Sequence, residues 1–390
     1  MSQRPHSNLS LTRRHWLMLA ASGASTTLTG CGGGSIGGGT AGLPGTGGTG
    51  TYALFSQGSI SGFGSVIVNG IKFDDGLASV QLDGIATTSA ELRLGMVAAV
   101  QGQRGADITL GTASRIEVWS VAQGLVSQSG NGEFTVAGVT VQTDSATVFD
   151  GVSSAAQLAP GQRVAVWGLQ AGADGRRWKA TRVAVVSATD LVSTGLISAV
   201  GAQRYLNGML LTGASAGSLV VGQLVRVQGI LSATGSSLAV TSFQVQGLSA
   251  SLQPAGEIEV EGMVTTLVSA NRFTLGNANV DASTATYSPV GAQVTLGARV
   301  EVYGSWLAGV LKATKVEIED AQVLHQVEID ARIDQFTSVA SFSMRGQRCD
   351  ATNALFSHGK ASDLKAGVKV KVKGAKSGAD VLMVAEVDFD

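Results

Sequence analysis

Apolar and polar residues alternate along short segments of this chain, and one such segment recurs. Residues 161–168 have the sequence Gly-Gln-Arg-Val-Ala-Val-Trp-Gly, with valine at two alternate positions. Alternation with a period of two is typical of a β-strand that buries one face. Similar segments occupy 222–229, 297–304 and 367–374, and a looser copy occupies 95–102. We therefore predict five copies of one strand, each between a turn glycine and a glycine where the strand bends or ends.

Further sequence features recur once in each copy, and the opening position of the copies has a period of about 66 to 71 residues. An opening glycine stands at 58, 124, 195 and 262, with Ala331 in the fifth copy. A two-residue turn follows in each copy, as in Val68-Asn69-Gly70-Ile71, and Asn-Gly favours a β-hairpin because both turn positions need positive φ. The other predicted hairpins lie at 136–139, 206–209, 275–278 and 344–347.

The repeats predict an all-β fold, a tandem array of about five small OB-like β-barrels that follows a disordered, lipidated N-terminus. Open edges would leave a unit of this size marginally stable, so closure into a small barrel is favoured. A single large β-sandwich and an open β-solenoid remain alternatives, and the units could stack or remain beaded. The predicted barrels span 56–121, 122–190, 191–250, 256–321 and 325–390, and the third lacks part of its middle.

Composition supports a β-rich chain and argues against a general polyanion binder. The chain has 53 Gly and 44% hydrophobic residues. Gly supplies tight turns, and the abundant Val favours strands. The basic residues among the first 30 are Arg4, Arg13 and Arg14, so their removal shifts the net charge from −1 to about −4. We therefore expect no nucleic-acid partner.

Residues 1–30 are predicted to be an export signal. The basic pair Arg13 and Arg14 precedes a short, weakly apolar stretch and a small-residue exit. The pair, followed by Trp16-Leu17, resembles a twin-arginine signal. The choice between twin-arginine and general export stays open.

The signal ends in Leu28-Thr29-Gly30-Cys31, which resembles a bacterial lipobox. Its cysteine would accept lipid, and several acyl chains would anchor the protein stably at a membrane surface. Residues 31–55 are predicted to be a flexible Gly/Thr-rich tether. Gly32 after the cysteine favours the outer membrane in organisms that sort by that position.

The segment 58–73, which begins Gly-Ser-Ile-Ser-Gly-Phe-Gly, and the Gly-x-x-Val-x-Val-x-Gly strand together resemble the domain of unknown function 5666 family. The likeness covers roughly residues 56–389. The resemblance implies small β-barrels at a cell envelope and implies no known activity or catalytic residue.

No catalytic, metal or cofactor site is expected. His325 and His358 remain after the signal, and neither has a carboxylate pair or cysteine at ligand spacing. Cys349 invites comparison with a nucleophile, but it stands three residues past its hairpin glycine. Three sister copies place Phe73, Val141 and Leu211 there, and the fourth, whose turn is Gly276-Asn277, has Val280 at the corresponding strand position, which predicts a core position for Cys349.

Five residues are the candidate binding residues. Trp167 and Tyr303 hold the same place, one residue before the second glycine, and face away from the valine pair. We expect them to cover a neighbouring unit; stacking on sugars is the alternative. Lys369, Lys371 and Lys373 form a basic ridge on one strand face. Glu257, Glu259 and Glu261 are expected to form a solvated strand face, with Ca²⁺ binding as the alternative.

We therefore expect a non-enzymatic, exported lipoprotein, held at the cell envelope by its lipid anchor, with the outer membrane as the favoured site. Its repeats would serve as a structural or protein-docking module with an envelope protein as partner. The alternative is a protein that binds an envelope glycan or another anionic polymer on its barrel faces.

Overall fold

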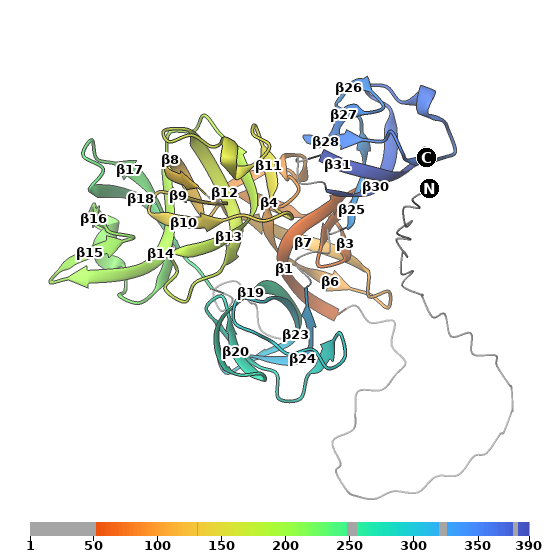
Figure 1. Ribbon diagram of the computed structural model, residues 1–390. Coiled ribbons are helices and arrows are strands. Elements are labelled where there is room, and N and C mark those ends of the chain that lie inside the picture. The colour runs from red at the N-terminus through yellow and green to blue at the C-terminus, as the bar shows by residue number, and fades with distance from the viewer. Residues whose placement is uncertain (1–51, 131, 248–255, 320–325, 377–380, 390) are drawn as a thin grey trace, which may run out of the picture. The chain divides into compact units, whose positions relative to one another are not determined.

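The structure, a computed structural model, describes residues 52–130, 132–247, 256–319, 326–376 and 381–389. Within these ranges the regular structure consists of β-strands and short 3₁₀ helices, and no α-helix occurs. Figure 1 shows the strands grouped into small curled sheets. The all-β prediction is confirmed.

The second barrel shows the shared plan most clearly. Its five main strands are β8 (Ala122–Gly130), β9 (Glu133–Val136), β10 (Val139–Gln142), β12 (Arg163–Gln170) and β13 (Arg177–Val185). Antiparallel pairs join β8 to β9, β9 to β10, β13 to β12 and β12 back to β8, and a parallel pair joins β10 to β13. The sheet therefore closes on itself, which removes the free edges of the main strands.

Between the third and fourth main strands the chain adds a short strand, here β11 (Val148–Asp150), followed by the 3₁₀ helix η2 (Ala155–Gln157). It pairs in parallel with the second half of β13. We call this element the covering strand, because it lies along a part of the fifth main strand that β10 does not reach.

The first and fourth barrels repeat this plan. The first contains β1 (Tyr52–Phe63), β2 (Val66–Val68), β3 (Ile71–Asp74), the covering strand β4 (Ser79–Leu82) with β5 (Ile85–Thr87), η1 (Ser89–Glu91), β6 (Val97–Arg104) and β7 (Leu110–Val118). The fourth contains β19 (Glu257–Ser269), β20 (Arg272–Leu275), β21 (Ala278–Asp281), the covering strand β22 (Thr286–Ser288), β23 (Arg299–Leu307) and β24 (Val310–Ile318).

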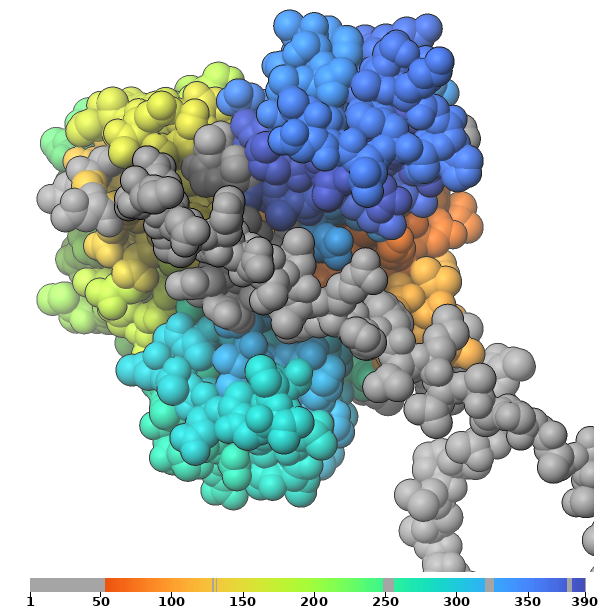
Figure 2. All heavy atoms as spheres, turned by 45° about the vertical axis from the view of Figure 1, so that its right-hand side comes forward, coloured from red at the N-terminus to blue at the C-terminus, as the bar shows by residue number. Residues whose placement is uncertain are grey.

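The third and fifth barrels vary the plan. The third has β14 (Leu191–Val200), β15 (Gln203–Leu206), β16 (Met209–Thr212), η3 (Ala214–Ser218), β17 (Leu224–Leu231) and β18 (Ser237–Val245), with no covering strand in 191–247. The fifth divides its first strand into β25 (Gln326–Arg332) and β26 (Gln335–Ser338), followed by β27 (Ser341–Met344), β28 (Gln347–Asp350), the covering strand β29 (Leu355–Ser357), η4 (Ala361–Asp363), β30 (Lys369–Lys376) and β31 (Val381–Asp388). In the space-filling view the residues of the fifth barrel, in blue, form a compact body (Figure 2).

The two glycines of the recurring strand have separate structural roles. The first adopts positive φ in every copy, from +77° to +87°, and its N–H donates to a carbonyl of the first main strand; Gly161 N lies 2.8 Å from Val126 O. The second lies at a register shift between the fourth and fifth strands, where a Cβ would clash with the opposite backbone. At Gly168 that Cβ would stand 2.4 Å from Lys179 O. Gly102, Gly229, Gly304 and Gly374 are equally crowded.

Each barrel interior is filled by the inward-facing apolar residues of these strands. The two valines of the recurring segment are 0% exposed in the second barrel, at Val164 and Val166. The position three residues past the second residue of each hairpin turn is also buried in all five copies, and Cys349 there is 1% exposed. The predicted core position of Cys349 is confirmed.

Strand pairing also joins barrels to one another. The first strand of the first barrel, β1, pairs in parallel with β19 of the fourth barrel and with β25 of the fifth. The first strands of the second and third barrels, β8 and β14, also pair with each other, in antiparallel orientation. The barrels therefore pack on each other by backbone hydrogen bonds rather than remaining beaded, while each still closes on itself. This closure excludes the alternatives of one large sandwich or an open solenoid for the described residues.

Candidate functional site

The candidate binding residues all lie on one recurring surface, the outward side of the fourth main strand. We call it the outer strand face. Its inward neighbours are valines, with Ala98 as the exception, whereas no two barrels have the same set of three outward residues, as expected for the part of a repeat that carries individual contacts. In chain order these residues are Val97, Ala99 and Gln101; Arg163, Ala165 and Trp167; Leu224, Arg226 and Gln228; Arg299, Glu301 and Tyr303; and Lys369, Lys371 and Lys373.

In the fifth barrel the lysine ridge lies between carboxylates of both neighbouring strands. Lys369 Nζ lies 3.1 Å from Asp330 Oδ1, and Lys373 Nζ lies 3.8 Å from Glu386 Oε2. Lys371 stands opposite Asp330 in β25 and opposite Asp388 in β31. The positive charge of the ridge is therefore largely balanced within the barrel, which weakens its attraction for an anionic surface.

The two aromatic candidates are engaged by neighbouring residues. Trp167 is 5% exposed and belongs to the same apolar cluster as core residues of the first barrel. Tyr303 is half-buried; its hydroxyl donates to Glu317 Oε2 at 2.8 Å, and Lys315 Nζ lies 4.7 Å from the ring centroid. The placement of Trp167 agrees with the expectation that this position covers a neighbouring unit.

The acidic row on β19 is not a solvated strand face, and that prediction was wrong. Glu259 is 1% exposed and Glu261 is 6% exposed. The reason is that β19 lies beside β1 of the first barrel, a pairing between segments about 200 residues apart that strand alternation alone does not reveal. Arg104 forms ion pairs with Glu257 and, at 3.9 Å, with Glu259.

Glu261 is held by both barrels. It forms an ion pair with Arg299 and accepts hydrogen bonds from the backbone N–H and the hydroxyl of Ser59, at 2.7 and 3.0 Å. Burial alone would lower the pKa of Arg299, but the carboxylates of Glu261, Glu319 and Asp144 together outweigh burial and raise it. The carboxylates of this row are thus occupied by arginines of this chain, which does not favour Ca²⁺ binding.

A further carboxyl group, that of Glu301, lies on the outer strand face of the fourth barrel. It is adjacent to the carboxyl group of Glu259 in β19. Burial raises the pKa of Glu301 to about 11, and the hydrogen bond and negative charge of Glu259 add to the shift. Burial also raises the pKa of Glu259, although the hydrogen bond with Glu301 and the charge of Arg104 oppose this. Burial and the neighbouring Glu259 carboxyl group therefore favour the protonated, neutral form of Glu301.

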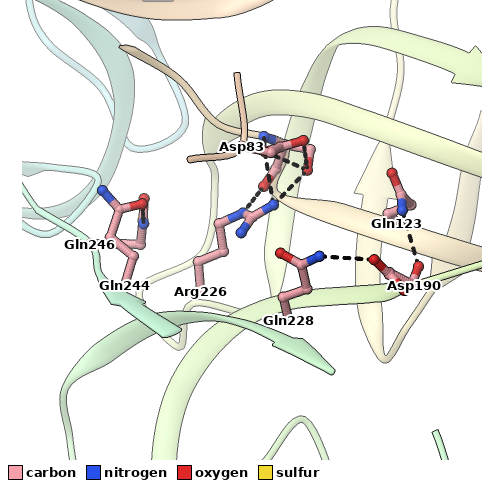
Figure 3. A network of polar contacts seen from close by, with 8 residues as sticks. Asp83, Gln123, Asp190, Arg226, Gln228, Gln244 and Gln246 are labelled. Carbon is pink, nitrogen blue, oxygen red and sulfur yellow. Dashed lines mark hydrogen bonds and ion pairs between the residues drawn. The ribbon is translucent and has the colours of Figure 1, made fainter. Parts of the chain in front are cut away.

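The third barrel contributes a buried arginine, Arg226, that sequence reasoning missed (Figure 3). Arg226 is 3% exposed, and its Nη2 lies 2.8 Å from Asp83 Oδ1 in the β4–β5 turn of the first barrel. Its Nε donates to Ser120 O at 2.7 Å, and its Cζ lies 5.2 Å from the centroid of the Trp119 ring. Burial lowers the pKa of Arg226, and the charge of Asp83 opposes that shift.

Asp83 is fixed for this contact by the local sequence. Asp83-Gly84 adopts positive φ at both positions, the backbone of a tight hairpin turn. Its Oδ1 also accepts from the Ser120 N–H at 2.7 Å. The available signal was an arginine at an outer strand position combined with an Asp-Gly turn, but nothing in the sequence pairs the two residues.

Amide side chains extend the network between the second and third barrels (Figure 3). Gln228 Nε2 donates to Asp190 Oδ2 at 3.0 Å, and Gln123 Nε2 donates to Asp190 O at 3.0 Å. Asp190 lies between β13 and β14, so the network ties the connecting segment to both barrels. The outer strand face of the third barrel, through Gln228, therefore helps to hold the second and third barrels together.

A cavity of about 130 Å³ lies where residues of the first four barrels meet. The rings of Trp119 and Trp178 help to line it, and so do five side-chain amides: Gln57, Gln170, Gln244, Gln246 and Asn277. Aromatic rings with amides can receive a polar ligand such as a sugar. Trp178 is already 6% exposed, with its indole N–H donating to Gly175 O at 3.0 Å.

Cys349 and His358 occupy contrasting environments. Burial raises the pKa of the Cys349 thiol to about 12, which opposes formation of a nucleophilic thiolate. His358 is exposed, and its Nδ1 lies 2.6 Å from Asp388 Oδ1, which also accepts from the Ser357 hydroxyl. Asp388 is thus the shared partner, whereas a catalytic triad places the histidine between the other two residues.

The predicted signal and anchor residues lie outside the described residues. These are Arg13, Arg14, Leu28, Thr29, Gly30 and Cys31, and His325 also lies outside. In the part of the chain that the structure describes, no helix is both long and apolar enough to cross a membrane. The same part contains no group of three or more His, Cys, Asp or Glu residues placed to hold a metal ion.

The fold defines a class: a tandem array of small, closed, five-stranded β-barrels. Two segments, residues 123–184 and 261–317, match a family described as a domain of unknown function (DUF5666). The second and fourth barrels therefore match this family, and the resemblance predicted from the glycine and valine pattern is confirmed there. No curated protein matches the chain.

Proposed function

We propose that this protein is a non-enzymatic component of the bacterial cell envelope, anchored by lipid on Cys31, whose barrels form a rigid module for docking other envelope proteins. The proposed location is the outer membrane. Export and anchoring rest on the arginine pair and the lipobox-like residues 28–31. The Gly/Thr-rich stretch after Cys31 would let the barrels stand off the membrane.

One observation carries the proposal. Charged side chains of two outer strand faces contact other barrels of the same chain: Arg226 contacts Asp83, and Arg299 contacts Ser59. Further contacts link Lys72 with Glu328 and Arg345 with Ser89 O. A module whose polar side chains hold its own barrels together is suited to act as a spacer or scaffold. Rigid units present docking surfaces without the entropic cost of ordering them on binding.

Two measurements test this function. Metabolic labelling with a fatty-acid analogue is expected to label the wild-type protein and not Cys31→Ser; equal labelling of both would contradict the anchor. Crosslinking in intact envelopes is expected to give discrete adducts with other proteins. If the wild-type protein forms no adducts at a crosslinker concentration that joins the subunits of a known envelope complex, that result would contradict the docking role.

Glycan binding is the second candidate, and the cavity beside Trp119 and Trp178 favours it. A peptidoglycan or glycan pull-down with Trp119→Ala tests it, with Trp167→Ala and Tyr303→Ala beside it for the outer strand face. Binding that depends on any of these rings would support this candidate. Equal retention of the wild-type protein and the variants would contradict it.

A further inference from the structure

The third barrel lacks an element that its four sisters possess. In the sisters the covering strand pairs in parallel with the second half of the fifth main strand, at 115–118, 182–184, 315–317 and 386–388. In the second barrel, residues 143–154 between β10 and η2 supply it, whereas Gly213 alone separates β16 from η3. The structural counterpart of 182–184 in the third barrel is 242–244, which has no covering strand among the described residues.

The loss exposes a residue that is otherwise core. The middle covered residue is Ile116, Val183, Val316 or Val387 in the sister barrels, each 0% exposed. Its counterpart in the third barrel is Phe243, which is 37% exposed. Residues 241–243 of β18 are all exposed, although the same half of β13 is buried at 181–183. An unpaired strand edge beside an exposed aromatic residue is a template for the addition of another strand.

The sister barrels show what such a strand must look like. The covering residue that faces Val183, Val316 or Val387 is aromatic in each case, namely Phe149, Tyr287 or Phe356, and it is Val80 in the first barrel. The residue after the aromatic one is Asp150, Ser288 or Ser357. The covering strand runs parallel to the fifth main strand in all four sister barrels. The geometry therefore defines a short extended segment with a central Phe or Tyr followed by a small acidic or hydroxyl residue.

We propose that the edge formed by Ser242, Phe243 and Gln244 of β18 binds an extended segment of a partner polypeptide by parallel strand addition, with a Phe or Tyr of the partner packed over Phe243. This deepens the proposed docking function and rests on it. The chemistry of the site defines the partner as a peptide segment of the type Val-Phe-Asp, Thr-Tyr-Ser or Leu-Phe-Ser, which the chain itself uses in three of the four sister barrels. Backbone hydrogen bonds would supply affinity, and the aromatic residue would supply specificity.

A labelled peptide with the sequence of residues 145–153, Ser-Ala-Thr-Val-Phe-Asp-Gly-Val-Ser, is a direct probe. Its binding to the full chain carrying Cys31→Ser is measured by fluorescence anisotropy. We expect saturable binding, at least tenfold weaker for the peptide in which serine replaces the phenylalanine. Phe243→Ser in the chain should weaken binding to the same extent, whereas Val200→Ser, at a 69% exposed position in the same barrel, should leave it unchanged.

A grafted chain supplies the second variant. Replacing Gly213 by the sequence of residues 143–154 should provide the missing strand in cis, abolish peptide binding and raise the melting temperature. Saturable binding lost in the graft and in Phe243→Ser supports the proposal. No binding to the wild-type chain, binding retained in the graft, or a dimer that buries Phe243 against a second copy would overturn it. Envelope adducts that persist in Phe243→Ser would contradict binding at this edge of β18 and would leave the proposed docking function unaffected.

Discussion

Arg226 Nη2 of the third barrel lies 2.8 Å from Asp83 Oδ1 of the first barrel, across 143 positions of sequence. The arginine is 3% exposed and the Asp83 side chain 23% exposed, so the pair lies largely away from water. Removing one member of such a pair leaves a charge without its partner, which costs more than the pair itself contributes.

We predict that Arg226→Met lowers the free energy of unfolding by about 3 kcal/mol. Urea denaturation measures it, and Arg176→Met, at an exposed arginine of the second barrel, should stay within about 0.5 kcal/mol of wild type. The double variant Arg226→Met/Asp83→Asn should recover part of the loss, since no carboxylate is then left unpaired. A loss equal to that of Arg176→Met would contradict the structural role of the pair.

The two glycines of the recurring strand should respond differently to alanine. Gly161 has φ of +87° with open space around its missing Cβ, so Gly161→Ala should cost about 1–2 kcal/mol from backbone strain alone. Gly168 has no positive φ, but its new Cβ would meet the backbone oxygen of Lys179 at 2.4 Å and force the strands apart, so Gly168→Ala should cost clearly more. Denaturation of the two variants checks the order. Equal costs would show that the register shift at Gly168 does not crowd the backbone.

The Cys349 thiol gives a prediction for alkaline pH. Its pKa of about 12 lies above the ordinary value near 9, so in this window the folded state keeps a proton that the unfolded state releases. The stability contribution of Cys349 is therefore complete below about pH 9 and is lost as pH rises towards 12. Cys349→Val, which installs the residue of the second and fourth barrels, should lose stability less steeply there. Rapid labelling of native Cys349 by a thiol reagent at pH 8 would contradict its burial.

The Glu301 carboxyl group gives a prediction for lower pH values, between about pH 5 and pH 9. Its folded pKa is raised from 4.5 to about 11, so its contribution is complete below about pH 4.5 and declines as pH rises through this interval. Glu301→Gln keeps a donor for Glu259 and cannot ionise. Relative to wild type, the variant should gain at least about 1 kcal/mol of unfolding free energy between pH 5 and pH 9. A difference independent of pH would show that Glu301 is already ionised in the folded protein.

The fold was largely predictable because its signals are local. The first glycine needs positive φ, the second needs an empty Cβ position, and the valines between them need one buried face, so all three leave marks within eight residues. The hairpin turns are equally local: Asn69-Gly70 and Asn207-Gly208 have positive φ at both positions, as predicted. The core position of Cys349 followed from the register of its sister residues.

The contacts between barrels could not be assigned in the same way. Whether Glu259 is solvated depends on the pairing of β19 with β1, and the partner of Arg226 depends on a turn in another barrel. These contacts join residues separated by more than a hundred positions and differ from barrel to barrel, so no repeat pattern encodes them. The shorter third repeat was visible in the sequence, but the exposure of Phe243 required the register of β17 against β18.

The central claim is that the first and fourth main strands of each barrel meet and close the sheet. In the second barrel, Leu125 of β8 stands directly opposite Arg163 of β12 at this seam. Leu125→Cys/Arg163→Cys in a Cys31→Ser/Cys349→Val background is predicted to form a disulfide on mild oxidation, because opposed residues of antiparallel strands lie within bridging distance. The pair Leu125→Cys/Val221→Cys serves as a control and should remain reduced. Free thiols in the first pair, under conditions that leave the protein folded, would contradict a closed barrel.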